Sequence, residues 1–115
     1  MYMPKKKYEM HIVSHTHWDR EWRLPFQEFR MKLCDCMDHL FDIMKKNPDF
    51  KHFTLDGQSI MVEDYLQARP EKRKQMAEYI KNGKILVGPW YTLIDESLLH
   101  GESIIRNPGK YWVLK

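Results

Sequence analysis

The chain has 115 residues, of which 43% are hydrophobic and 30% charged. This composition excludes a disordered chain and predicts one globular domain with a core of its own. The net charge of +3 comes with two basic runs, at 5–7 and 72–74, that lack interleaved aromatic residues, so we expect no nucleic-acid binding. No apolar run approaches the length of a membrane span, and the first residues lack the apolar segment of a signal peptide. Both features favour a cytoplasmic protein that does not cross a membrane.

A short apolar run at 10–13 predicts a buried β-strand, and a dense polar cluster at 15–22 follows it directly. The cluster contains two histidines, two acids and two tryptophans, a mixture that packing alone does not explain. Alternate residues of an extended segment share a face, so we expect His15, His17 and Asp19 to converge. Imidazole nitrogens and carboxylate oxygens are typical zinc ligands, which makes this cluster a candidate metal site.

Helices and strands alternate along the rest of the chain. A helix of about twenty residues is predicted from Pro25 to a stop at 47–49. A strand at 50–55, a helix from Ser59, a second helix from Pro70 to a glycine cap at Gly83, and a strand at 84–87 follow. The order predicts an α/β fold built from parallel β-α-β units.

The long helix carries an apolar stripe at spacings of three and four residues, which predicts its buried face. The stripe consists of Phe29, Leu33, Cys36, Met37, Leu40, Phe41 and Met44. The two cysteines, Cys34 and Cys36, lie two apart and would project to different faces of the helix, so we expect free thiols, with Cys36 near the core.

Each predicted strand is followed by polar or aromatic residues, and parallel strands place such clusters at one edge of the sheet. Trp22, Trp90 and Tyr91 offer flat apolar faces, and four acids offer hydroxyl acceptors: Asp19, Asp56, Asp95 and Glu96. That mixture suits a carbohydrate. The alternatives are that Trp90 packs between a strand and a helix, that Asp95 and Glu96 cap a helix, and that the acid before Gly57 only forms a turn.

The motif His-Thr-His-Trp-Asp-Arg-Glu-Trp at 15–22 resembles the opening motif of glycoside hydrolase family 38, the α-mannosidases. The resemblance continues through 55–58, 63–66, 69–71, 87–91, 95–96 and 101–107, and it is similar in style to bacterial cytoplasmic members such as mannosylglycerate hydrolases. It implies that residues 1–115 form a single partial domain, the N-terminal part of an irregular (β/α) barrel, with the similarity ending near Asn107.

The resemblance also implies a retaining enzyme that cleaves α-mannosides and holds one zinc ion. His17 and Asp19 match two zinc ligands of the family, and Trp22 matches an indole in its sugar-binding subsite. His15 fits the motif but matches no family ligand, which implies a supporting role. No residue of this chain matches the aspartate nucleophile, so we expect no hydrolysis by the chain alone.

Two other functions remain open from the sequence. The first is a separate sugar- or metal-binding module that acts through its open sheet edge. The second is an amidohydrolase-like metal enzyme, because such barrels also carry His-x-His after their first strand. About three strands of a barrel leave edges unpaired, which also predicts self-association through those strands.

Overall fold

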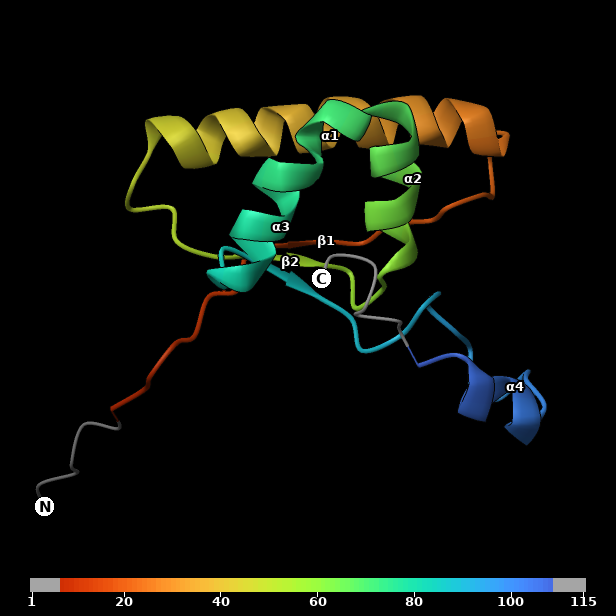
Figure 1. The fold of residues 1–115 in the computed structure, drawn as a ribbon. Coiled ribbons are helices and arrows are strands. Elements are labelled where there is room, and N and C mark those ends of the chain that lie inside the picture. The colour runs from red at the N-terminus through yellow and green to blue at the C-terminus, as the bar shows by residue number, and fades with distance from the viewer. Residues whose placement is uncertain (1–6, 109–115) are drawn as a thin grey trace, which may run out of the picture.

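The computed structural model describes residues 7–108, and these residues form an α/β fold around a three-stranded sheet (Figure 1). The elements in chain order are β1 (His15–Thr16), α1 (Phe26–Lys46), β2 (Phe53–Leu55), α2 (Ile60–Ala68), the 3₁₀ helix η1 (Pro70–Lys72), α3 (Arg73–Lys81), β3 (Ile85–Val87) and α4 (Gly101–Arg106). Both strand pairs are parallel, in the order β1-β2-β3. The predicted β-α-β units are therefore confirmed, with α1 in the first crossover and α2 to α3 in the second.

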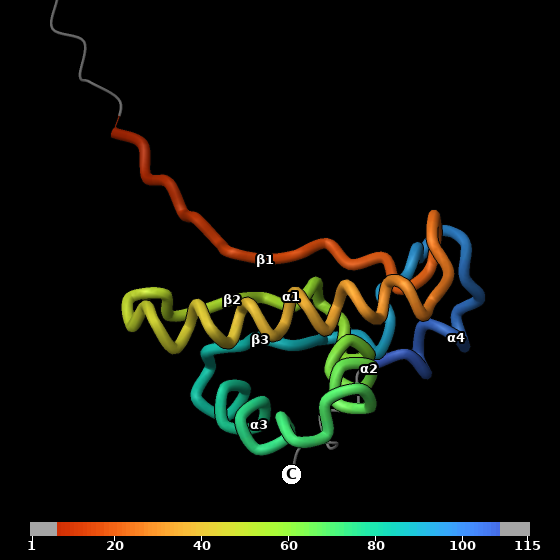
Figure 2. The backbone as a smooth tube through the Cα atoms, turned by 90° about the horizontal axis from the view of Figure 1, so that it is seen from above, coloured from red at the N-terminus to blue at the C-terminus, as the bar shows by residue number. Residues whose placement is uncertain are grey.

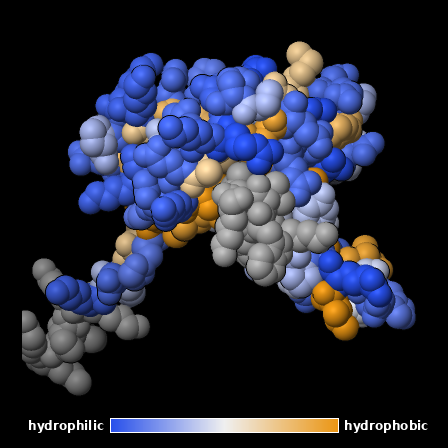
Figure 3. Space-filling view, in the orientation of Figure 1, coloured by the Kyte–Doolittle hydropathy of each residue, from blue (hydrophilic) through white to orange (hydrophobic). Residues whose placement is uncertain are grey.

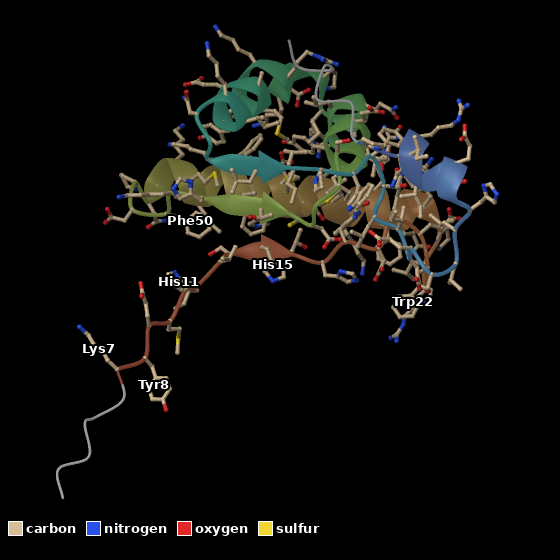
Figure 4. The ribbon with its side chains drawn as sticks, turned by 90° about the horizontal axis from the view of Figure 1, so that it is seen from below. Lys7, Tyr8, His11, His15, Trp22 and Phe50 are labelled. Carbon is tan, nitrogen blue, oxygen red and sulfur yellow. The ribbon has the colours of Figure 1, made fainter. Side chains whose placement is uncertain are left out.

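The helices of both crossovers lie on one side of the sheet, above the strands in Figure 1 and behind them in the view from below in Figure 4. Leu55 and Ile85 point toward the helices and are buried. The opposite face carries a register row of His15, Thr54 and Leu86, and Leu86 is 46% exposed there. Helices on a single face are typical of a barrel wall, whereas a doubly wound sheet has helices on both faces. Three strands do not close a barrel, so the predicted barrel stays a prediction.

The core lies between the sheet and the helices. Most of its members are large hydrophobic side chains of α1 and α2, among them Leu33, Met37, Met61 and Tyr65, and Met76 of α3 is buried with them. The predicted stripe of α1 is correct at Leu33, Met37, Leu40, Phe41 and Met44, which are buried. Phe29 and Cys36 are only partly buried, and Cys34, which the stripe left out, is buried. Cys34 lies near the end of α2, where it lines a pocket with Ala68 and Arg69. Both thiols are free, as expected.

The helix and strand boundaries follow local backbone chemistry. α1 begins after Pro25 and ends before Asn47, whose backbone N–H donates to the Ile43 carbonyl at 2.8 Å. Gly83 takes a φ of +68° after α3, and the N–H of Lys84 donates to the Tyr79 carbonyl at 2.8 Å. This is the left-handed helix end that the glycine predicts.

The predicted buried strand at 10–13 is wrong. The strand begins only at His15, and Ile12 is 86% exposed. The N–H of Thr54 donates to the Ser14 carbonyl, but β2 starts at Phe53, so no described strand lies beside the residues before Ser14. An apolar run becomes a buried strand only where a neighbour covers it. Seen from above, the segment runs away from the sheet, opposite to α4 (Figure 2).

Exposed hydrophobic side chains gather below the helices and around α4, at the lower edge of the space-filling view (Figure 3). Exposed large hydrophobic residues of the described chain include Val13, Leu86, Leu98 and Ile105. None of the described helices is both long and apolar enough to cross a bilayer.

Candidate functional site

A pocket opens where the three parallel strands end, and the segment after each strand contributes to it. The first segment supplies His17, Trp18, Asp19, Arg20 and Glu21, the second supplies Gln58, and the third supplies residues 92–95. The sequence predicted that these clusters meet at one edge of the sheet, and the structure confirms it. The pocket follows the general rule that ligands bind at the carboxyl ends of parallel strands.

His17 lies between two carboxylates. Its Nε2 is 3.5 Å from Asp19 Oδ1, and its Nδ1 is 3.3 Å from Asp56 Oδ1. The carboxylate of Asp56 is almost buried, whereas the side chains of His17 and Asp19 reach solvent. One ring edge of His17 thus faces the protein, and the other faces the pocket together with Asp19.

Asp56 has a larger role than the turn that its sequence context predicts. It does form a turn, with a φ of 27° at Asp56 and 68° at Gly57. Its Oδ2 also accepts the backbone N–H of Trp18 at 2.7 Å and the Nε2 amide of Gln58 at 3.1 Å. The only signal in the sequence is its place directly after a strand, where turn and site residues look alike.

Gln58 joins all three segments that form the pocket. Its side chain is only 2% exposed, donates to the Trp18 carbonyl at 2.8 Å, and accepts the N–H of Leu93 at 3.4 Å. The neighbouring backbone strengthens this connection, since the N–H of Trp90 donates to the Gly57 carbonyl and the N–H of Ser59 donates to the Trp90 carbonyl. Gln58 lies within the motif at 55–58, but the sequence indicates no role for its side chain, because a single glutamine in a turn carries no pattern.

Arg20 anchors the first segment to α2. Its guanidinium donates to both carboxylate oxygens of Asp64, at 2.7 and 3.0 Å, and lies over the ring of Phe26. The hydrogen bond that Arg20 donates to Asp64 raises the pKa of Arg20 above its ordinary value, by more than partial burial lowers it. The third segment is anchored to the same helix, because the Tyr91 hydroxyl donates to Glu63 at 3.0 Å. Burial, followed by this hydrogen bond, raises the pKa of Tyr91.

The remaining sequence-predicted residues lie outside this cluster or at its rim. His15 belongs to the open face of β1, and its Nδ1 lies 3.2 Å from the Thr16 carbonyl, so the expected convergence of three side chains is wrong (Figure 4). The reason is that the chain leaves the sheet after Thr16 and no longer keeps the alternation of a strand. Trp22 is 67% exposed, stacks with Arg23 and points away from the sheet.

The aromatic and acidic residues of the third segment have different roles. Trp90 is half-buried, and its backbone forms a β-bridge with Gln58. Asp95 lines the pocket and accepts the N–H and hydroxyl of Ser97. It therefore stabilises a turn rather than the predicted helix start, and His100 caps α4 instead. Glu96 is exposed.

His17 and Asp19 have the donor chemistry and spacing for a shared metal ion. Two ligands about 2.0–2.1 Å from a tetrahedral zinc ion lie about 3.3 Å apart, close to the observed 3.5 Å. In residues 7–108 no group of three or more His, Cys, Asp and Glu side chains is arranged to hold a metal. The described chain can therefore supply two ligands of such a centre and an outer partner, Asp56.

The model of the glycosyl hydrolase family 38 N-terminal domain matches residues 7–113. The chain belongs to this family. The match extends beyond Asn107, near which the resemblance of the motifs ends. Residues 109–115 lie outside the described structure, and the single partial domain over residues 1–115 stays a prediction.

Relatives of this family 38 chain include a protein named "Putative mannosylglycerate hydrolase" from Halalkalibacterium halodurans, 47% identical over 97 residues, which are 84% of this chain and 11% of the relative. "Alpha-mannosidase 2" of Arabidopsis thaliana is 25% identical over 95% of this chain and 10% of its own length. An α-mannosidase structure from Enterococcus faecalis V583 superimposes with a TM-score of 0.81 at 46% identity. A second Enterococcus faecalis family 38 structure gives a TM-score of 0.75 at 42% identity. Each alignment covers 84% of this chain and 11% of the solved structure's chain. The chain thus spans about a tenth of its relatives' length.

Proposed function

We propose that this chain forms the N-terminal part of the catalytic domain of a zinc-dependent retaining α-mannosidase. In this proposal His17 and Asp19 are two of the zinc ligands, and Trp22 lines the subsite for the sugar. The observation that carries it is the placement of His17 Nε2 and Asp19 Oδ1 3.5 Å apart at the pocket. Family membership and the names of the relatives support the carbohydrate substrate.

The residues of this chain would hold the zinc ion and orient the sugar. They would not carry out the bond cleavage. His17 and Asp19 direct a nitrogen and an oxygen donor to one point at the pocket wall. A bound zinc ion would supply a Lewis-acidic centre for the hydroxyls of the mannose ring. Trp22 offers its exposed indole as a flat apolar surface for the C–H face of a sugar.

The chain alone is proposed to be inactive. Retaining glycosidases use one carboxylate as nucleophile and a second carboxyl group as acid, and the family's nucleophile matches no residue here. Catalytic zinc sites usually have three protein ligands, and the described residues provide two. We therefore expect weak zinc binding and no turnover.

A zinc titration tests the ligands. We expect one weak site on the 115-residue chain, lost in His17→Ala and in Asp19→Ala and retained in His11→Ala, which removes an exposed histidine away from the pocket. Equal binding by all four proteins would refute the assignment of the ligands. Tight one-to-one binding that requires both residues would instead favour an independent metal-binding module.

Hydrolysis of an aryl α-mannoside tests the inactivity separately. We expect no zinc-dependent release of the aryl group above background. Turnover that disappears in His17→Ala would contradict this part of the proposal, while leaving the α-mannosidase identity in place.

A further inference from the structure

We propose that Asp56 is a positioning residue that holds the imidazole of His17 with its proton on Nδ1 and its unprotonated Nε2 turned toward Asp19 and the pocket. The inference deepens the proposed function and rests on it, because it prepares His17 to be a metal ligand. The sequence context of Asp56 predicts only a turn.

The neutral ring of His17 has one N–H, and either of two carboxylates could accept its hydrogen bond. A neutral imidazole has one donor and one acceptor nitrogen, and an ionised carboxylate only accepts. Asp56 lies 3.3 Å from Nδ1, and Asp19 lies 3.5 Å from Nε2. The carboxylate of Asp56 is 10% exposed and that of Asp19 is 40% exposed. Because solvent and salt screen the buried partner less, Asp56 is the stronger acceptor, and the ring proton stays on Nδ1 and points toward it.

The carboxylate of Asp56 is held in place by hydrogen bonds that do not involve His17. One oxygen, Oδ2, accepts both the N–H of Trp18 and the amide of Gln58, which leaves Oδ1 for the ring. The turn that carries Asp56 is closed by the N–H of Gln58 on the Leu55 carbonyl, and Gly57 accepts the N–H of Trp90. Both the β2 turn and the segment after β3 therefore fix the position of this carboxylate.

The tautomer decides whether Nε2 can bind a cation. With the proton on Nδ1, the lone pair of Nε2 faces the pocket beside Asp19. A carboxylate on the far ring nitrogen also fixes the ring orientation and increases the basicity of the ligating nitrogen. Loss of such a partner typically weakens metal affinity about 10–100-fold.

The wild-type chain gives the first test. Long-range proton–nitrogen NMR of the metal-free, ¹⁵N-histidine-labelled 115-residue chain, at about pH 8 where imidazoles are ordinarily neutral, reports the tautomer of each ring, and His17→Gln assigns the His17 signal. We expect His17 to be protonated on Nδ1. His39 and His52 serve as internal references, because the Nδ1 of each lies 2.8 Å from a backbone carbonyl that can only accept. A His17 ring protonated on Nε2 overturns the inference.

The second test is Asp56→Asn, which preserves size and can keep a carbonyl oxygen on Trp18 and Gln58. Its amide then faces His17 as a donor, so we expect the His17 proton to move to Nε2 and zinc affinity to fall about 10–100-fold. The matched control is Asp42→Asn on the exposed surface of α1, which should change neither quantity.

The possible outcomes separate the inference from the proposed function. Reduced zinc affinity with an unchanged tautomer would overturn the positioning role. A switched tautomer in a chain that binds no zinc would support the positioning role and refute the zinc site. If Asp56→Asn does not fold, the wild-type tautomer decides by itself.

Discussion

Arg20 and Asp64 form a bidentate ion pair between the segment after β1 and helix α2, with nitrogen–oxygen distances of 2.7 and 3.0 Å. Asp64 is nearly buried, with a side chain only 3% exposed, while Arg20 keeps contact with solvent. The pair holds the segment that carries His17 and Asp19 against the core.

Arg20→Ala should destabilise the fold because it leaves the buried carboxylate of Asp64 without its partner. We expect a loss of about 2–4 kcal/mol of unfolding free energy, less than for a fully buried pair because Arg20 is partly exposed. Urea unfolding measures it. The control is Arg106→Ala, which breaks the exposed pair with Glu102 and should cost less than about 1 kcal/mol. Equal costs for both variants would argue against the anchoring role of Arg20.

Asp38 should make stability fall in acid. Burial alone would raise the pKa of Asp38, but hydrogen bonds from the Tyr65 hydroxyl at 2.7 Å and from Arg69 at 3.2 Å outweigh it and hold the pKa below its ordinary value. A lowered folded-state pKa gives stability that is fully present above the unfolded value of about 3.9 and is lost as the pH falls through the folded one.

Urea unfolding at about pH 6 and about pH 3, on either side of the ordinary carboxyl pKa, measures this contribution. The wild type should lose more stability between the two than Asp38→Asn, which has no carboxylate to protonate. Asp42→Asn, one turn further along α1, should behave as the wild type does. An acid dependence that is identical in Asp38→Asn would contradict the prediction.

Leu33 and Met31 lie two residues apart on α1, but Leu33 is on the buried face of the helix and Met31 is on its exposed face. Leu33 is fully buried in the core, and Met31 is 70% exposed. Leu33→Ala should cost about 2–5 kcal/mol through lost burial and a cavity, whereas Met31→Ala should stay within about 0.5 kcal/mol. Thermal or urea unfolding of the two variants checks this. Similar losses of unfolding free energy would mean that α1 turns a different face toward the core.

The open face of the sheet should make the isolated chain associate with itself. Leu86 is exposed on the edge strand β3, and unpaired strand edges pair readily with other chains. Sedimentation equilibrium should show concentration-dependent oligomers that shift toward monomer in Leu86→Lys. Leu98→Lys changes an exposed leucine remote from the strands and should leave the distribution unchanged. A wild-type chain that is monomeric at every concentration would rule this out.

Local patterns predicted the elements of this fold well. The spacing of Leu33, Met37 and Met44 located α1, and Gly83 located the end of α3, because both features reflect short-range geometry. The strand at 10–13 failed because burial depends on neighbours that the run itself does not specify. The polar motif located His17 and Asp19, whereas Asp56, Gln58 and Asp64 act across about forty residues. Such long-range contacts leave no periodicity in a single sequence.

The hydrogen bonds of Gln58 determine which of the three segments around the pocket can vary in length. The turn at 56–59 must bring one buried amide to both Trp18 and Leu93, so one inserted residue there would separate all three segments. The stretch at 96–100 is exposed and makes no described contact with Gln58, so it can lengthen without that penalty. Changes in chain length around the pocket should therefore be tolerated after β3 and not in the turn after β2.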